Sequence, residues 1–571
     1  MNLAAIAHEA TQRWCHAIEK DRFVIRIQTA KDDVQSIRLH TRDKYIPLKF
    51  FDSRKTYLME KVACDGLRDY YEAELTFHMV CLRYCFEITG RDGTRVILAN
   101  DGFVEEIPED KERLFDCPQN LREEELFRVP KWAENAVIYQ IFPARFASDK
   151  AVSPRLWYQA PIGGGTDLGG NLRGIINALD YIKSLGVDVV YMTPIFQSKS
   201  VHKYDTMDYY TIDPSFGTEA DLMELVDKAH GLGMKVMLDA VFNHTGTEFF
   251  AFRDLKKNGE KSRYKDWYYV EKFPVSVFPK PSYKCFGYFG YMPKVNLRNP
   301  EAGQYFTDVA LYWLRKTGID GWRLDVGDEV SHDFWHDFRK SIKQEFPEAL
   351  IVGEIWHHAP DFLQGDQWDS VMHYPFHRAV EDFAATGTIS ASTCLGRLGY
   401  LRGNTHRNAY PLLWNLIGSH DASRILHRCG GDRNRHRLAA AMQLLWPGAP
   451  MIYYGDEVGM TGGDDPDCRR GMLWDPERQD GETLAFYKKL LSLRRQEPAL
   501  LRGNIVDSQV SDPEGLILVT RKLENRSLTL VFHGKEGSVS LQEFEGYTDL
   551  ITGSRFDGTL EGIRALVLAK A

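Results

Sequence analysis

The sequence lacks the features of a secreted, membrane-spanning or disulfide-stabilised protein. Its first residues, from Met1 to Glu9, contain no basic cluster and no sustained apolar stretch, so we predict neither a signal peptide nor a membrane span and expect a cytoplasmic protein. The 9 cysteines are scattered, odd in number and without a C-x-x-C pair, which argues against a disulfide framework and a structural zinc site. We therefore expect reduced, mostly buried thiols.

A concentration of charge of one sign is also missing. The formal net charge is -9, but acidic and basic residues are mixed along the chain, so nothing predicts a nucleic-acid or other polyanionic partner. Aromatic residues, in contrast, make up 12% of the chain, and flat aromatic faces are surfaces against which sugar rings pack. The 571 residues are too many for one hydrophobic core, which predicts several domains.

The two ends of the chain have the pattern of short, alternating strands. Runs such as Phe23 to Ile27 and Val80 to Phe86 predict an N-terminal β-sandwich over residues 1–125, and the charge-rich stretch from Arg122 to Glu125 reads as the linker that follows it. Similar runs, Gly515 to Val519 and Ser527 to Val531, predict a C-terminal β-sandwich over residues 499–571.

Between the ends, over residues 126–498, buried apolar runs alternate with amphipathic segments. The segment from Leu172 to Leu185 places its apolar side chains on one helical face, and this alternation of strand and helix is typical of a parallel sheet. Eight such strands predict a closed (β/α)8 TIM barrel. The candidate strands are Ala136–Phe142, Val187–Thr193, Lys235–Phe242, Gly321–Val326, Ala349–Ile355, Ser370–Tyr374, Leu412–Gly418 and Pro450–Gly455. After the third strand, residues 245–299 are too long for a simple loop and predict an inserted subdomain.

Polar residues follow several of these strands where they end. Chemistry in such a barrel takes place at the carboxyl ends of the strands. The third strand ends in the stretch Asp239 to His244, the fourth contains Asp325, the fifth ends in Glu354, and the seventh runs into His420 and Asp421. Taken singly, an acid at a strand end is often a helix cap, so it is their joint placement that points to a site.

Three acidic groups around one cavity, here Asp325, Glu354 and Asp421, suit the cleavage of a glycosidic bond. One carboxylate attacks the anomeric carbon and one carboxylic acid protonates the leaving oxygen. Arg323 precedes Asp325 by two residues and so shares its strand face, where a fixed positive charge keeps a carboxylate ionised. This pattern favours Asp325 as the nucleophile and Glu354 as the general acid.

The same residues resemble the motifs of the α-amylase family of glycoside hydrolases. The motifs are Asp239 to His244, Gly321 to Asp325, Gly353 to Trp356 and Ser419 to Asp421, in the family's order. Within this family (family 13) the chain is similar to the cyclomaltodextrinase, neopullulanase and maltogenic amylase group, because Met292-Pro293-Lys294-Val295-Asn296 resembles that group's marker.

The resemblance implies roles for individual residues. It implies Asp325 as nucleophile, Glu354 as acid/base and Asp421 as the group that stabilises the transition state and holds sugar hydroxyls. It further implies that Tyr204 stacks on the sugar ring and that other residues contact the substrate, namely Arg323, His244, His420 and the pair Asp465 and Arg469. For Trp356, beside the acid, both packing and substrate contact fit. In the inserted region, Phe286, Tyr288 and Phe289 form either an aromatic platform for glucan or a small local core.

The resemblance also implies an activity and a partner. It implies a retaining hydrolase of α-1,4 and also α-1,6 bonds in cyclomaltodextrins, maltooligosaccharides and pullulan, with some transglycosylation, in a homodimer and without an organic cofactor. The stretch Phe146 to Val152, where many relatives bind calcium, has one carboxylate and an adjacent lysine, so calcium is not predicted. Val326-Gly327-Asp328-Glu329 also departs from the group's usual residues, which puts the subsites for the leaving sugar in doubt.

Two alternatives stay open at this point. An exo-acting α-glucosidase or oligo-1,6-glucosidase uses the same carboxylates on chain ends, and it would not open a cyclic substrate. An amylase-like barrel without catalysis, used as a binding subunit, would be expected to have lost these carboxylates, whereas this chain keeps all of them.

Overall fold

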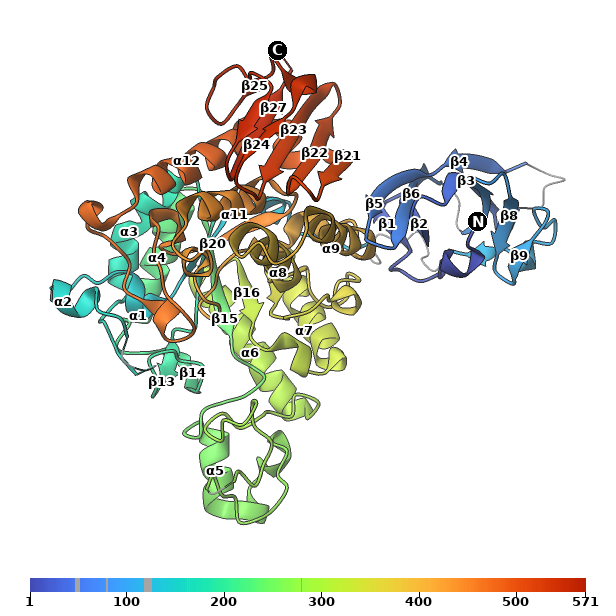
Figure 1. Ribbon diagram of the computed structural model, residues 1–571. Helices are drawn as coiled ribbons and strands as arrows, with labels where there is room; N and C mark the ends of the chain where they lie inside the picture. The colour runs from blue at the N-terminus through green and yellow to red at the C-terminus, as the bar shows by residue number, and fades with distance from the viewer. Residues whose placement is uncertain are drawn as a thin grey trace.

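The computed structural model describes residues 1–46, 52–78, 81–117, 126–161, 163, 165–278 and 280–570. A barrel forms the centre, with an all-β N-terminal domain at its side, an all-β C-terminal domain above it and a subdomain around α5 (Phe250–Asn258) projecting below (Figure 1). This confirms the predicted fold class. The predicted linker and the boundary at residue 125 lie outside the described residues, and the other domain boundaries stay predictions.

All eight predicted barrel strands are present in one parallel sheet. Its order is β18-β17-β16-β15-β12-β11-β20-β19, and a parallel bridge between Met372 and Trp414 joins its two outer strands into a closed cylinder. The strands are β11 (Ile138–Ile141), β12 (Val189–Met192), β15 (Lys235–Ala240), β16 (Gly321–Leu324), β17 (Leu350–Gly353), β18 (Ser370–Val371), β19 (Trp414–Leu416) and β20 (Ala449–Tyr453).

Alternate side chains of each strand enter two different cores. Ile138, Val189 and Val352 belong to the cluster that fills the barrel interior, whereas Tyr139 and Val190 pack outward under the helices. This is the period of two that a strand imposes on its side chains. The surrounding helices are α3 (Leu172–Leu185), α4 (Glu219–Gly231), α6 (Pro300–Thr317), α7 (His332–Glu345), α8 (Tyr374–Val380), α9 (Ala391–Asn404), α11 (Arg433–Leu445) and α12 (Gly481–Gln496).

Local sequence explains where these helices begin and end. Helix α3 has the predicted bounds, because the Asn171 side chain accepts a hydrogen bond from the amide of Gly174 and Gly186 ends the helix in a left-handed conformation. Helix α4 begins with a capping box in which Thr218 and Asp221 bond each other's backbone amides. These caps satisfy amides that would otherwise have no partner at the helix start.

The N-terminal domain consists of two antiparallel sheets around a shared apolar core, as predicted. One sheet has the order β1-β2-β6-β5, and the other has the order β4-β3-β7-β8-β9, with β10 paired to β7. The strands are β1 (Cys15–Glu19), β2 (Arg22–Ala30), β3 (Val34–Asp43), β4 (Lys55–Leu58), β5 (Glu60–Cys64), β6 (Arg68–Thr76), β7 (Leu82–Gly90), β8 (Arg95–Ala99), β9 (Gly102–Val104) and β10 (Phe115–Asp116).

Buried polar contacts join this domain to the segment that follows α9. Arg26 on β2 donates to Glu72 on β6 at 2.7 Å, and it also donates to the carbonyl of Thr405. The ring of His16 stacks on that of His406, with 3.9 Å between ring centroids. The N-terminal domain is therefore held at the side of the barrel, where Figure 1 shows it next to α9.

The C-terminal domain has a five-stranded antiparallel sheet and a separate two-stranded ribbon. An apolar cluster that includes Leu518, Val539 and Leu560 lies between the two layers. The sheet comprises β21 (Asn504–Ser511), β22 (Leu516–Leu523), β23 (Arg526–His533), β27 (Arg564–Ala569) and β25 (Thr548–Asp549), and the ribbon comprises β24 (Ser538–Ser540) and β26 (Thr559–Glu561). Two buried arginines, Arg494 on α12 and Arg521 on β22, donate to backbone carbonyls around the junction with the barrel.

Two further observations concern the chain as a whole. All 9 cysteines are free, and only Cys64 and Cys285 are partly exposed, as expected. Within the described residues, no helix combines the length and apolar character needed to cross a membrane.

The buried ion pair Arg26–Glu72 yields a prediction for stability. Burial by itself raises the pKa of Glu72, but the guanidinium of Arg26 lowers it to about 2. Replacing Glu72 with glutamine leaves Arg26 buried without its charge partner, so the free energy of unfolding in urea at neutral pH is expected to fall by about 3–5 kcal/mol.

The sign of the pH dependence follows from the lowered pKa. The stabilisation by Glu72 is present above the unfolded value of 4.5 and is lost as the pH falls toward about 2, so parent and variant are expected to converge over this range. Asp101→Asn serves as the control, because it removes an exposed ion pair with Arg113 and is expected to cost less than about 1 kcal/mol. Equal effects of the two variants would contradict the prediction.

Candidate active site

Two of the predicted carboxylates, Asp325 and Glu354, lie with a further carboxylate, Asp239, at the carboxyl ends of three neighbouring barrel strands. The register pairs Asp239 on β15 with Arg323 on β16, and Asp325 and Glu354 directly follow β16 and β17. Gly353 precedes the acid because a Cβ atom there would lie 2.2 Å from the ring of Trp368. Close packing of Trp368 against β17 therefore requires glycine at position 353, and this packing fixes the position of Glu354 at the end of the strand.

One buried arginine contacts all three carboxylates. Arg323 is 0% exposed, and its Nη1 atom lies 2.9 Å from an oxygen of Asp239 and 2.8 Å from Oδ1 of Asp325. Its Nη2 atom lies 2.8 Å from Oε2 of Glu354. The remaining oxygen of Asp325, Oδ2, has no hydrogen-bond partner among the described residues. One face of the Asp325 carboxylate is thus held and the other is left for a ligand.

The backbone after Asp325 adopts a conformation that a β-branched residue rarely takes. Val326 has a φ of 47°, in the left-handed region. In this conformation its amide donates to Oε2 of Glu354 at 2.9 Å. Strain of this kind is tolerated where the surroundings hold it in place, and here it links the positions of the two carboxyl groups.

Burial and neighbouring charges shift the pKa values of the carboxyl groups in this cluster. Burial raises the pKa of Asp325, while the Arg323 guanidinium opposes that rise. Burial also raises the pKa of Glu354, and the charge of Asp421 adds to the rise. The hydrogen bond from Arg323 to Oδ1 favours the ionised form of Asp325, and the contacts of Arg323 and of the Val326 amide with Oε2 favour the ionised form of Glu354. The carboxyl groups of this cluster therefore take up and release protons as one interacting set.

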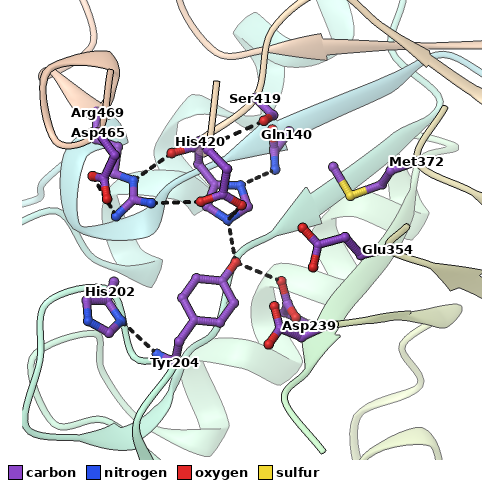
Figure 2. A network of polar contacts seen from close by, with 12 residues as sticks. Gln140, His202, Tyr204, Asp239, Glu354, Met372, Ser419, His420, Asp465 and Arg469 are labelled. Atoms are coloured by element: carbon purple, nitrogen blue, oxygen red, sulfur yellow. Dashed lines mark hydrogen bonds and ion pairs between the residues drawn. The ribbon is translucent and has the colours of Figure 1, made fainter. Parts of the chain in front are cut away.

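A chain of hydrogen bonds runs behind the third predicted carboxylate (Figure 2). Gln140 contacts Nδ1 of His420 at 2.8 Å, and Nε2 of His420 lies 3.0 Å from Asp421 and 2.5 Å from the hydroxyl of Tyr204. The rings of Tyr204 and His420 are stacked, with 7° between their planes. Burial by itself raises the pKa of Asp421, but His420 and Arg469 hold it well below its usual range. Asp421 is therefore an anion.

Arg469 and Asp465 lie next to Asp421. Arg469 donates to Oδ1 of Asp421 at 2.9 Å and pairs with Asp465 at the same distance of 2.9 Å. Its Nε atom donates to the carbonyl of His420, which fixes the plane of the guanidinium. This rigid arrangement presents carboxylate oxygens at a fixed spacing, as hydroxyl recognition requires.

A cavity of about 390 Å³ collects most of the predicted residues. Its lining includes Tyr204, His244, Asp325, Glu354, Trp356, Asp421, Asp465 and Arg469. Arg323 and His420, in contrast, are fully buried behind this surface and reach it only through Asp325, Asp421 and Tyr204. They orient the lining residues of this cavity rather than forming its wall.

The inserted subdomain supplies aromatic side chains to the same cavity. Phe286 and Phe289 line it, and Phe286 stacks on His244 with 5.2 Å between centroids. Tyr288, by contrast, is 99% exposed and lies outside the cavity lining. Burial lowers the pKa of His244 to about 3, so its imidazole is neutral, and its Nε2 atom lies 4.0 Å from Asp325 without a hydrogen-bond partner.

Several residues at the site are not among those that the sequence predicts for it. Asp239, which the sequence indicates only as the end of the third strand, is the third carboxylate in contact with Arg323. It follows Met237, an interior residue of β15, by two residues, so the alternation of the strand points Asp239 inward as well. His202, two residues before Tyr204, also lines the cavity. Lys294 of the group's marker pairs with Glu329 at 2.9 Å, which ties the subdomain to the loop after β16.

Comparison with known proteins agrees with this geometry. Residues 140–503 match the model of the alpha amylase catalytic domain, and residues 1–119 match that of the alpha amylase N-terminal ig-like domain. The chain belongs to the alpha-amylase family. Within it, the chain is 40% identical to a cyclomaltodextrinase of Geobacillus thermopakistaniensis, over 98% of this chain and 97% of that protein.

Two further comparisons place this alpha-amylase family member among its relatives. It is 41% identical to neopullulanase 2 of Thermoactinomyces vulgaris, over 98% of this chain and 96% of that protein. A solved structure of a cyclomaltodextrinase superposes on it with a TM-score of 0.93 at 35% identity, covering 100% of both chains. The chain is thus a glycoside hydrolase of the cyclomaltodextrinase and neopullulanase type.

The exposed tryptophan beside the acid yields a prediction for substrate binding. Trp356 is 43% exposed at the cavity and stacks on Tyr374, with 3.8 Å between ring centroids. Trp356→Ala is expected to raise KM by about 2- to 10-fold and to change kcat little, because a stacking surface is lost while the carboxylates stay in place. Trp356→Phe is the matched control and is expected to keep most of the affinity. An unchanged KM in the alanine variant would assign Trp356 to packing alone.

Proposed function

We propose that this enzyme hydrolyses α-1,4 and α-1,6 glucosidic bonds of cyclomaltodextrins, maltooligosaccharides and pullulan, with retention of configuration and some transglycosylation. The observation that supports this proposal is the contact of one buried arginine, Arg323, with both Asp325 and Glu354 at a cavity lined by aromatic rings. Such a cluster holds one carboxylate ionised and a second carboxyl group protonated, the two states that glycoside cleavage requires.

In the first step, Glu354 gives its proton to the glycosidic oxygen while Asp325 attacks the anomeric carbon. The attacking atom is Oδ2, which has no partner among the described residues, whereas Oδ1 stays bonded to Arg323. The bond between carbon and leaving oxygen breaks, and a glycosyl ester of Asp325 forms. The amide of Val326 keeps Glu354 beside the leaving oxygen throughout.

In the second step, Glu354 acts as a base. It takes a proton from water, the water oxygen attacks the anomeric carbon, and Asp325 leaves as the carboxylate. When the hydroxyl of another sugar occupies the place of water, the same step forms a new glycosidic bond. Asp421, fixed by Arg469 and His420, accepts hydrogen bonds from hydroxyls of the sugar being cleaved and stabilises the positive charge that develops on its ring.

Substrate preference is open to a direct test. Purified enzyme is expected to open β-cyclodextrin faster than it cleaves soluble starch, and to cleave pullulan, because the cavity of about 390 Å³ accepts short segments of glucan. Asp325→Asn and Glu354→Gln are each expected to lower kcat by about 10³-fold or more. Asp333→Asn, the same chemical change at an exposed position on α7, is expected to leave activity unchanged.

The outcomes of this experiment separate the alternatives. Activity confined to the ends of linear chains, with no ring opening, would contradict the proposal in favour of an exo-acting α-glucosidase or oligo-1,6-glucosidase. Full activity in Asp325→Asn would contradict the assigned nucleophile. Rapid ring opening with slow starch cleavage would support an enzyme that favours small substrates.

We also propose that the enzyme acts as a homodimer in which each N-terminal domain covers the partner's cavity. The support is that the N-terminal domain packs beside α9 of its own barrel, and none of its described residues lines the cavity. Sedimentation velocity at micromolar concentration is expected to show a particle of twice the chain mass of 65.6 kDa. A monomer under these conditions would contradict the proposed covering of the cavity.

Finally, we propose that catalysis needs no metal and takes place in the cytoplasm. The carboxylate in the stretch where many relatives bind calcium, Asp149, is already engaged, since it accepts a hydrogen bond from Asn171 at 2.7 Å. Prolonged dialysis against EDTA is therefore expected to leave kcat and the melting temperature unchanged, and a loss restored by calcium would contradict this. The free thiols of all 9 cysteines fit a reducing compartment.

A further inference from the structure

A second cavity lies in the N-terminal domain, away from the catalytic cluster. Along β3, Ile37 and Leu39 point into the domain core, so the alternate side chains of His40 and Arg42 lie on the outer face of their sheet. On this face a cavity of about 640 Å³ is lined by residues of β3, β4 and β7 and by the segment from Ile107 to Leu114.

The feature of interest in this cavity is the guanidinium of Arg42. Arg42 is only 8% exposed, and it donates one hydrogen bond, from Nη1 to the carbonyl of Glu109 at 3.0 Å. Among the described residues, its Nε and Nη2 atoms have no hydrogen-bond partner and Arg42 takes part in no ion pair. A buried charge without a directly paired carboxylate is costly because it has lost hydration, and here the charge of Asp110 offsets this cost only in part.

The neighbouring charges make the need for an anion greater. The register places Arg83 on β7 directly beside Arg42, and Arg54, the residue before β4, lines the same cavity and acts on the charge of Arg42. Both of these arginines are already paired, Arg83 with Asp116 at 2.6 Å and Arg54 with Asp52 at 2.7 Å. Burial lowers the pKa of Arg42, and the charge of Arg83 lowers it further. A negative ligand in the cavity would offset both effects.

Two atoms at the wall of the catalytic cavity have a similar setting. There, Oδ2 of Asp325 and Nε2 of His244 are likewise buried at a cavity wall and have no partner among the described residues. Arg42 has the same combination of features in a domain that contributes nothing to the lining of the catalytic cavity.

We propose that this cavity of the N-terminal domain binds a small oxyanion through Arg42, either free phosphate or the phosphoryl group of a phosphorylated monosaccharide. A guanidinium presents parallel N–H groups that match two oxygens of one phosphoryl group. The volume falls in the range of cavities that hold small organic ligands, and Ile107, Pro108 and Leu114 provide an apolar wall against which a sugar ring packs.

Calorimetric titration of the full chain tests this proposal. Inorganic phosphate and glucose 6-phosphate are titrated separately at constant ionic strength, with chloride and glucose as blanks. Both oxyanions are expected to bind saturably, and Arg42→Gln is expected to weaken binding by about tenfold or more, the effect of losing charge-assisted hydrogen bonds. Arg38→Gln is the matched control, because Arg38 lies on the same face of the same strand but outside the cavity lining.

The remaining outcomes have defined meanings. Tighter binding of glucose 6-phosphate than of phosphate identifies a phosphorylated sugar as the ligand, and equal binding identifies free phosphate. In case Arg42→Gln unfolds the domain, Arg54→Gln serves as a second variant, since Arg54 is exposed and lines the cavity, and it is expected to weaken binding as well. Absence of binding by the parent, or equal weakening by Arg38→Gln and the cavity variants, would overturn the proposal.

Discussion

The contact of Arg323 with three carboxylates is the constraint on which the catalytic end of the barrel depends. Asp239, Asp325 and Glu354 come from three successive strands, and one buried guanidinium reaches all of them. Without that charge the carboxylates would repel each other in a low-dielectric setting and would take up protons. Because the strand register fixes Asp239 opposite Arg323, the fold and the charge balance of the site are set by the same pairing.

The domains around this barrel are attached through buried polar groups rather than through apolar contacts alone. In the N-terminal domain, Arg26 is paired with Glu72 and donates a hydrogen bond to the carbonyl of Thr405 in the barrel. Near the C-terminal domain, backbone carbonyls accept hydrogen bonds from Arg494 and Arg521. Such contacts fix one orientation, since a buried guanidinium that shifts loses its partners. A few buried side chains therefore help to fix the position of each domain relative to the cavity.

The sequence was informative where a single period or a strand end decides the outcome. All eight barrel strands and the bounds of α3 followed from apolar patterning, and the carboxylates followed from their place after strands. The apolar pattern of a strand does not show which of its side chains a distant segment of the chain will cover. The resemblance places His420 in contact with the substrate, yet Tyr204 and Asp421 lie between its ring and the cavity. Arg42, on the outer face of its sheet, is buried by a segment 67 residues further along the chain, at Glu109. Such contacts between segments distant in the chain require the three-dimensional structure.

The closure of the barrel has a consequence for its motions. Strand β18 is only two residues long, and a single bridge between Met372 and Trp414 joins the two outer strands of the sheet. Amide hydrogens at the seam where β18 meets β19 are therefore expected to exchange with solvent faster than those of strands that are paired along their full length. Tyr374, on which Trp356 stacks, follows the seam directly. A transient opening of the cylinder would therefore reach the mouth of the cavity at Trp356 first, while Asp325, two strands away, keeps its place.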